Sequence, residues 1–580
     1  MAAEARQAGE DIGPSAGETD AAREADQLRR LAEGFLASGN PRAALGYLAR
    51  ARTLFPADVA LAIRHGMALA DCGVLDEAEA AFHAALARAP DNADALVRLA
   101  NVLVDLGRHD EAIAVASALL RRTPSHVGAR ASLARAHFFK EDWQRAWQLF
   151  EVRFRLMDKP PQVTRPGPDG KPQPWAPWRG GALPPSLLVI AEQGLGDTIQ
   201  FVRFLPRLVA AGTAVTFVCE PALAALLGTL DCPMTLKSLR EPGRVEGIKG
   251  WTPLLNLPMA LGLQPSVYTM ERPYLAAEPE RVARWRERLG PGFKIGISWQ
   301  GNPTGEIDRG RSARLADFEP LARLAGVRLV SLQKGHGADQ LDDVPFASRI
   351  VVPGPDFDEG PNAFVDTAAV MECLDLVVTV DTAVGHLAGA LGRPVTLLLK
   401  AFGADWRWLQ NRTDTLWYPS MRLARQQRQG DWRGLIEQVA GELMREKGMA
   451  STGGAMPKVP ISVGELIDKL AILEIKGERI EDADKRDNVE RERAELQAVL
   501  DGLGLETDAL EIFRAGLRGV NEQLWEIEDE IRLCEKAGDF GPRFIELARA
   551  VYKTNDRRAD LKREINKLSG SALFEEKSYA

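Results

Sequence analysis

Cysteine is scarce in this chain, and the spacing of the cysteines argues against a disulfide framework and against a structural zinc site. Only five cysteines occur in 580 residues, and no two of them form a C-x-x-C pair. A disulfide framework and a structural zinc site both need closely spaced or paired cysteines, so neither is expected. Unpaired thiols are typical of a reducing compartment, and we expect a cytoplasmic protein. The five are Cys72, Cys219, Cys232, Cys373 and Cys534.

Long apolar runs and a surplus of positive charge are also missing. No window approaches the roughly 18 uninterrupted apolar residues that a membrane helix needs. The net charge of −8 gives no global electrostatic reason to bind nucleic acid. We therefore expect neither a membrane span nor a nucleic-acid partner. The first residues are acidic, without the basic patch and apolar run of a signal peptide, and we interpret residues 1–24 as a disordered leader.

Three kinds of residue recur every 34 positions within residues 25–160. In such a unit, glycine suits the turn between two helices, and proline stops the second helix because it lacks an N–H donor. A small residue between them lets the helices approach closely. A fourth copy has Trp143, Ala146 and Phe150 but no turn glycine, and we predict a terminal cap. The recurring sets are Gly39, Gly73 and Gly107; Ala44, Ala78 and Ala112; and Pro56, Pro90 and Pro124.

This region resembles the tetratricopeptide repeat, whose unit is a pair of antiparallel helices. The resemblance implies an α-solenoid, with a plain helical bundle as the alternative. Solenoids of this kind present a concave surface, which usually holds a peptide or protein partner.

The middle of the chain has the pattern of an α/β domain. Residues 161–185 are too rich in proline and glycine for regular structure and are predicted to be a linker. In residues 186–447, short β-branched runs alternate with helical patterns. Runs that are apolar on both faces suit parallel strands covered by helices. Two sets of such strands predict two Rossmann-like lobes that face a cleft.

The end of the chain differs in character. A second predicted linker, residues 448–460, precedes long charged helical patterns over residues 461–580. Ser462 and Glu465 have the spacing of a helix capping box. We therefore predict an all-α module, which resembles a small bacterial helical domain of unknown function.

The stretch AEQGLGDTIQFV carries the first candidate site. Gly194 and Gly196 follow a predicted strand and open a helix, so backbone N–H groups there could point at an anion. The dinucleotide fingerprint fails, because Ile199 stands where a third glycine would be needed. Asp197 lies at the carboxyl end of a strand, where ligands bind in α/β folds. We consider it a candidate general base, with a helix cap as the alternative.

The stretch VTVDTAVGHLAGALGRPV carries the second candidate site. A buried strand ends at Asp381, and Thr382 and Ala383 begin a helix that bears His386. Helix N–H groups and a hydroxyl can receive a diphosphate, while the carboxylate can accept hydrogen bonds from sugar hydroxyls. This combination fits a nucleotide-sugar donor. The alternative is a helix-capping Asp with a buried structural histidine.

A third group of polar residues follows other predicted strands. In ISWQGNPTGEIDRGRS, the arginines could neutralise phosphate through their planar set of donors, or could lie on a solvated basic loop. Asp356 and Asp358 have the D-x-D spacing of some metal-binding glycosyltransferases, but the pattern is common and we predict neither a metal site nor a cofactor. The donor-site candidates of this group are Gln300, Asn302, Arg311, Gln333 and Lys334, and Asp405 and Trp406 could line the same cleft.

Together these clusters resemble the lipopolysaccharide heptosyltransferases of glycosyltransferase family nine, which have the two-lobed GT-B fold. Residues 25–445 more closely resemble bacterial proteins that fuse tetratricopeptide repeats to such a domain. The resemblance implies inverting, metal-independent sugar transfer from a nucleotide sugar, with Asp197 as the base. It places the donor at Asp381, Thr382 and His386, and only loosely at Arg311. The family usually has glycine where this chain has Ala383.

The combination of repeats and a GT-B domain is also similar to the O-linked protein glycosyltransferases and to some bacterial flagellin glycosyltransferases. This similarity implies a protein acceptor, with flagellin as one candidate. The alternative is an inactive scaffold in a surface-glycan or flagellar assembly pathway, for which the Ala383 departure leaves room. A GT-B epimerase would not explain the repeats.

Overall fold

The structure is a computed structural model. It describes residues 16–573 except 39, 167–170, 240–246, 271, 304–307, 309, 361–362, 450–460, 481, 504, 506–507 and 572. The chain forms two compact units, Met1–Gly454 and Ala455–Ala580. No helix of the described residues is both long and apolar enough to cross a membrane. All five cysteines are free thiols.

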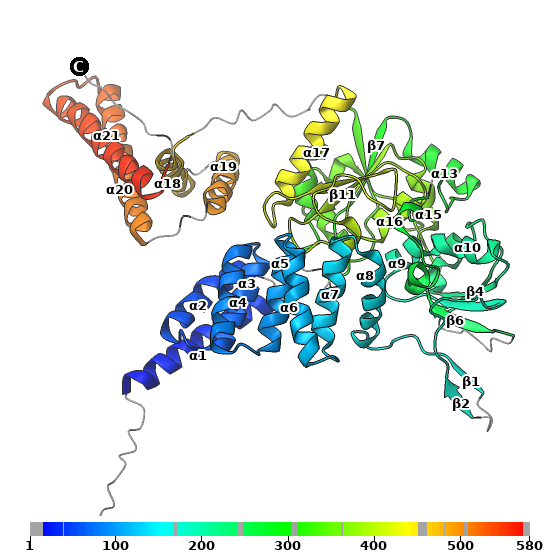
Figure 1. Cartoon of the computed structure of the whole chain (residues 1–580). Helices are drawn as coiled ribbons and strands as arrows, with labels where there is room; N and C mark the ends of the chain where they lie inside the picture. Colours follow the sequence, from blue (N-terminus) through cyan, green and yellow to red (C-terminus); the bar gives the residue numbers. More distant parts are fainter. Residues whose placement is uncertain are drawn as a thin grey trace, which may run out of the picture. The chain divides into compact units, whose positions relative to one another are not determined.

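Paired antiparallel helices form the first part of the larger unit (Figure 1). The first helix begins at Ala16, inside the range predicted as a disordered leader, because the alanine- and glutamate-rich stretch after residue 15 favours a helix. Residues 1–15 of that leader lie outside the described residues. The helices are α1 (Ala16–Ala37), α2 (Pro41–Leu54), α3 (Val59–Asp71), α4 (Leu75–Arg88), α5 (Ala93–Asp105), α6 (His109–Arg122), α7 (Val127–Phe139) and α8 (Trp143–Phe150).

The 34-residue periodicity corresponds to this geometry, and the predicted repeat solenoid is confirmed. Gly73 and Gly107 adopt φ values of 79° and 77°, which glycine tolerates at no steric cost. In the fourth copy Glu141 occupies the same turn with φ 61°. Gly39 lies outside the described residues. The prolines follow the ends of α2, α4 and α6, and the small residues at the helix contacts are buried: Ala44, Ala78, Ala112 and Ala146.

The fourth copy, predicted to be a terminal cap, is the last helix pair of the repeats and packs against the α/β region. Trp147 of α8 donates a hydrogen bond from Nε1 to the Tyr268 hydroxyl of the α/β region at 2.7 Å. Its aromatic side chains pack against the α/β region because they are too apolar to remain in solvent.

The segment predicted as an irregular linker contains a short antiparallel hairpin, β1 (Thr164–Pro166) and β2 (Pro172–Pro174). Proline is tolerated there because both strands are exposed edges. Beyond the hairpin, Trp175 accepts a hydrogen bond at its carbonyl oxygen from Trp251 Nε1 at 2.7 Å. The segment is therefore packed onto the first lobe.

The first lobe is a parallel four-stranded sheet of order β5-β4-β3-β6. Short helices follow β3, β4 and β6. The strands are β3 (Ser186–Ile190), β4 (Ala214–Cys219), β5 (Thr235–Ser238) and β6 (Gly250–Pro253), and the helices are α9 (Leu195–Phe201), α10 (Leu205–Ala210), α11 (Ala224–Leu227) and α12 (Leu257–Ala260).

The second lobe is a parallel six-stranded sheet of order β12-β11-β10-β7-β8-β9. The chain runs outward from β7 and then returns to β10 beside it, so the strand order reverses between these two. Ligands in open α/β sheets bind at such a switch point, outside the carboxyl ends of the strands. The strands are β7 (Phe293–Ser298), β8 (Val327–Ser331), β9 (Ile350–Val351), β10 (Leu376–Val380), β11 (Val395–Leu399) and β12 (Met421–Arg425), and the helices are α13 (Pro279–Leu289), α14 (Glu319–Ala322), α15 (Val365–Met371), α16 (Ala383–Ala390) and α17 (Trp432–Lys447).

The two predicted Rossmann-like lobes are thus confirmed, and so is the all-α module of the smaller unit. In that module Ser462 Oγ accepts a hydrogen bond from Glu465 N at 3.2 Å, which caps the first helix. Asp468 is buried and pairs with Arg558 at 2.7 Å. The helices are α18 (Val463–Arg479), α19 (Ala483–Gly502), α20 (Asp508–Ala537) and α21 (Pro542–Leu568).

Candidate functional site

Two strand-to-helix loops, one from each lobe, meet at the candidate site. The first connects β3 to α9, and the second connects β10 to α16. A Cβ atom on Gly196 would lie 2.9 Å from His386 Cδ2 and 3.3 Å from Ala383 Cα. Glycine is therefore required at position 196 by contact between the lobes. This close approach brings both sequence-predicted motifs into one site.

Asp197 lies in the first turn of α9, and its carboxylate is partly exposed. Its interpretations as a general base and as a helix cap are therefore compatible. Its Oδ2 accepts a hydrogen bond from Gly194 N at 2.9 Å, which closes the first turn of α9. Its Oδ1 forms an ion pair with Arg407 Nη2, and the side chain keeps 21% of its surface exposed. Burial raises the pKa of Asp197, while the Arg407 charge opposes that rise.

Arg407 is the residue that the sequence reasoning missed. Its Nη1 donates to both Asp405 carboxylate oxygens at 3.0 Å, and its Nε donates to Gln200 Oε1 at 2.7 Å. The side chain is only 7% exposed. The sequence feature that could have indicated Arg407 is a single arginine between two tryptophans in DWRWL. A charge in such an apolar setting needs a buried partner.

Asp381 follows β10 at the switch point but does not cap the next helix, so the capping alternative was wrong. Its Oδ2 accepts a hydrogen bond from Trp408 Nε1 at 2.9 Å. Thr382 is the N-cap residue, and no side chain of the described residues caps α16. Burial, and then the negative charge of Asp405, raise the pKa of Asp381 to about 6.

His386 is buried on α16 and has structural partners. Its Nδ1 lies 2.9 Å from the Tyr418 hydroxyl, and its ring stacks on Trp408 with centroids 5.4 Å apart. Burial, and then the charge of Arg407, hold the pKa of His386 well below its usual value. The imidazole is therefore neutral at physiological pH.

Residues of the third cluster mainly support the β7 and β8 loops. Gln333 Oε1 accepts hydrogen bonds from Ser298 Oγ, Trp299 N and Gln300 N, each at 3.0 Å. Lys334 Nζ donates to the Phe357 carbonyl oxygen at 2.7 Å. These two side chains thus fix loop geometry at the carboxyl edge of the sheet.

The other members of this cluster differ in surroundings. Gln300 Oε1 accepts a hydrogen bond from Gln340 Nε2 at 2.8 Å, and Asn302 lies exposed in the loop after β7. Arg311 pairs with Asp308 at 3.3 Å. The positive charge of Arg311 also acts to lower the pKa of Asp381, which places this guanidinium within electrostatic reach of the site.

The D-x-D carboxylates have separate partners. Asp356 pairs with Arg288 at 2.7 Å. Asp358 is buried and accepts hydrogen bonds from Asp366 N at 2.7 Å and Thr367 N at 3.2 Å, so it closes the start of α15. Among the described residues, no group of three or more His, Cys, Asp or Glu side chains could hold a metal ion.

Family models match three parts of the chain. Residues 63–127 and 97–152 match a tetratricopeptide repeat model, and residues 457–580 match a family of unknown function, DUF6165. Residues 360–403, which include β10, Asp381 and α16, match glycosyltransferase family 9 (heptosyltransferase). This match lies within the second lobe and supports a glycosyltransferase domain in the central region. The chain therefore combines tetratricopeptide repeats, a glycosyltransferase domain and a C-terminal helical module.

Individual relatives are more distant. Protein FlbA of Caulobacter vibrioides is 26% identical over 325 residues, which are 51% of this chain and 52% of FlbA. The chain thus spans about half the length of this relative. The solved structure of E. coli ADP-heptose LPS heptosyltransferase II is 13% identical and has a TM-score of 0.33, covering 45% of this chain and 99% of that one. MamA from Desulfovibrio magneticus is 24% identical, with a TM-score of 0.22, and covers 23% of this chain and 75% of MamA.

Proposed function

We propose that this chain is an inverting, metal-independent glycosyltransferase that moves a sugar from a nucleotide sugar to a polypeptide. The observation that carries the proposal is the meeting of Asp197 with the uncapped start of α16 at a topological switch point. That arrangement supplies a carboxylate for the acceptor and N–H donors for the leaving group. The reaction takes place in the domain whose residues 360–403 match the glycosyltransferase family.

The donor binds through the second lobe. The first N–H groups of α16 and the Thr382 hydroxyl receive the phosphates, because a helix N-terminus favours negative charge. The Asp381 carboxylate accepts hydrogen bonds from sugar hydroxyls, and Arg311 adds positive charge to the phosphate side. Neutral His386 supports the first turn of α16 through its contact with Tyr418.

Asp197 removes the proton from the acceptor. The acceptor oxygen attacks the anomeric carbon of the sugar, the bond from that carbon to phosphate breaks, and the nucleotide leaves with the bonding electrons. Asp197 holds the released proton. Positioned proton removal is worth about 10² to 10⁴ in rate, because a neutral hydroxyl is a poor nucleophile. The Arg407 charge favours the ionised carboxylate that this role needs.

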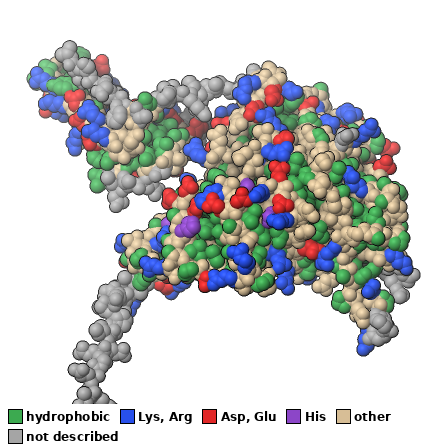
Figure 2. Space-filling view, viewed as in Figure 1, with side chains coloured by type: hydrophobic (Ala, Val, Ile, Leu, Met, Phe, Trp, Pro, Cys, Tyr) green, Lys and Arg blue, Asp and Glu red, His purple; other side chains and the backbone are tan. Residues whose placement is uncertain are grey.

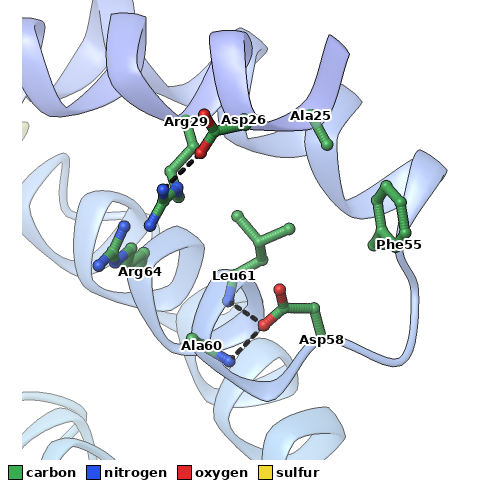
Figure 3. A pocket seen from close by; sticks show the side chains of 8 residues that line it. All are labelled: Ala25, Asp26, Arg29, Phe55, Asp58, Ala60, Leu61 and Arg64. Atoms are coloured by element: carbon green, nitrogen blue, oxygen red, sulfur yellow. Dashed lines mark hydrogen bonds and ion pairs between the residues drawn. The ribbon is translucent and has the colours of Figure 1, made fainter. Parts of the chain in front are cut away.

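The repeats recruit the acceptor, for which flagellin is a candidate. A notch in the first repeats is lined by apolar Ala25, Phe55 and Leu61 beside the charged Arg29 and Arg64 (Figure 3). Arg29 pairs with Asp26 and Arg64 pairs with Glu33, so the apolar side chains are what this notch offers to an extended peptide. Lys, Arg, Asp and Glu side chains are interspersed over the face of the repeats in Figure 2.

A thermal-shift screen of the full chain against UDP, GDP, CMP, ADP and their sugar conjugates tests the donor site. A ligand at about 100 times its dissociation constant adds roughly 2.7 kcal/mol of stability. We expect one nucleotide class to stabilise the protein and Asp381→Ala to weaken that effect. Absence of any shift in a folded protein would contradict the proposal and favour the inactive scaffold.

A further inference from the structure

The last repeat is built into the surroundings of the Asp197–Arg407 pair. Trp406, directly before Arg407, stacks on Phe138 of α7 with ring centroids 3.9 Å apart and an interplanar angle of 13°. Trp147 and Phe150 contact the same indole edge-on, at 5.4 Å and 5.6 Å. Three repeat aromatics therefore hold the residue that precedes the guanidinium.

The same repeat also holds the loop that carries Asp197. Arg153, in the 3-10 turn after α8, bonds Glu192 through Nη2 at 2.6 Å and Nε at 2.9 Å. The Glu192 side chain has no exposed surface and accepts a further hydrogen bond from Leu255 N at 3.1 Å. Glu192 lies in the β3–α9 loop, directly ahead of the turn that contains Gly194 and Asp197. Both partners of the ion pair are thus fixed to one repeat.

We propose that the last repeat is a structural part of the catalytic centre, in which Phe138 and Arg153 position Arg407 against Asp197. Phe138, Arg153 and Trp406 are then positioning residues, and Asp197 is the group that meets the acceptor. This inference rests on the proposed function for its kinetic test. The regular repeats then recruit the acceptor, and the last repeat aligns Arg407 with Asp197.

The charges around Asp197 give this role a specific signature. Arg407 and Arg153 favour its ionised form, and Asp405 opposes it. Neutral His386 approaches the same turn through Gly196. When Arg407 moves away, the carboxylate loses its nearest positive charge, so its pKa rises and the base is protonated at higher pH. The acidic limb of the pH–rate profile should then move to higher pH.

Phe138→Leu and Phe82→Leu form a matched pair for the test. Both phenylalanines are 1% exposed in the repeats, but Phe82 packs against Gly66 inside the regular array. The readout is nucleotide release from the sugar conjugate that stabilises the wild type, with flagellin present as the acceptor, measured from pH 5 to 9. We expect Phe138→Leu to lower kcat by about tenfold or more while the donor KM stays near the wild-type value. Its acidic limb should move to higher pH, and that of Phe82→Leu should not.

A pH profile of Phe138→Leu that matches Phe82→Leu would overturn the inference while leaving the proposed function intact. No nucleotide release by the wild type would instead contradict the proposed function. Melting temperatures then test the inference without an activity assay. Asp197→Asn, Arg407→Lys and the double variant are measured once in the wild-type background and once in the Phe138→Leu background. We expect the non-additivity of the pair to fall by half or more with Phe138→Leu. Unchanged non-additivity would overturn the inference whatever the activity.

Discussion

The two loops that meet at the site differ in how each treats its carboxylate. In the first lobe, Asp197 has a guanidinium partner, Arg407, and a backbone N–H donor from Gly194. In the second lobe, Asp381 accepts from an uncharged indole N–H and faces the negative charge of Asp405. Both pKa values are raised by burial, but only Asp197 has a positive charge in direct contact. The difference separates a carboxylate whose ionised form has a cation in direct contact from one whose ionised form has only an uncharged donor in contact.

Among the changes that test this difference, removal of Arg407 should reduce the free energy of unfolding the most. Arg407→Met leaves Asp197 and Asp405 without their cation in a setting where the arginine is only 7% exposed. Breaking a buried ion pair in this way costs about 3–5 kcal/mol. Denaturant unfolding of the full chain measures it. Arg412→Met is the matched control, because its partner Asp414 is 70% exposed and the loss should stay below about 1 kcal/mol. Equal losses would contradict the assigned difference.

Asp381→Asn should weaken donor binding while sparing the fold. The amide keeps the shape of the side chain but loses the charge that strengthens hydrogen bonds to sugar hydroxyls. Hydrogen bonds to charged groups contribute about 1.5–3 kcal/mol, so we expect the donor dissociation constant to rise by roughly 10- to 150-fold. Isothermal titration calorimetry with the stabilising conjugate measures it. A wild-type affinity in Asp381→Asn would remove this residue from the donor site.

Gly196→Ala tests the contact that brings the two loops together. The new Cβ would lie 2.9 Å from His386 Cδ2, which is closer than packing allows. Overpacking of this kind costs about 1–3 kcal/mol. Gly212 has a φ of 86°, but a Cβ added there would meet no heavy atom within 4 Å, so Gly212→Ala reports backbone strain alone. If thermal unfolding showed a smaller loss of stability for Gly196→Ala than for Gly212→Ala, the two loops would lie further apart than in this structure.

Asp381 also makes the stability of the folded chain depend on pH. Its pKa is about 6 in the folded chain against 3.8 for an unperturbed side chain. The folded state therefore binds the proton more tightly, and stability falls as pH rises from about 4 to about 6. The contribution is up to about 3 kcal/mol. Melting temperatures of the wild type and Asp381→Asn across this window should converge at low pH; parallel curves would contradict the raised pKa.

The local features of the site could be predicted from the sequence, but its long-range pairing could not. Gly194, Asp197, Asp381 and Thr382 stand in strand–turn–helix patterns whose geometry is set by neighbouring residues. The ion pair between Asp197 and Arg407 joins positions 210 residues apart, and no spacing rule connects them. The sequence pattern assigned Gly196 to its own turn, but a helix of the other lobe is what requires glycine there.

The repeats show the same division between local features and long-range contacts. A 34-residue period predicted the turns and the buried small residues, because each depends on one helix pair. The bulky side chains of the last copy have no period. Their partner Trp406 is supplied by the second lobe, so the docking of this copy is visible only in the folded chain.

Nucleotide release by Asp197→Asn, compared with the wild type and with Asp381→Asn, tests the central claim most directly. The full chain is given the stabilising nucleotide sugar and flagellin from the same source, and product is followed by mass spectrometry. We predict a rate about 10² to 10⁴ lower for Asp197→Asn at saturating donor, with the donor-dependent thermal shift unchanged. Transfer by Asp197→Asn at a rate near that of the wild type would contradict the account.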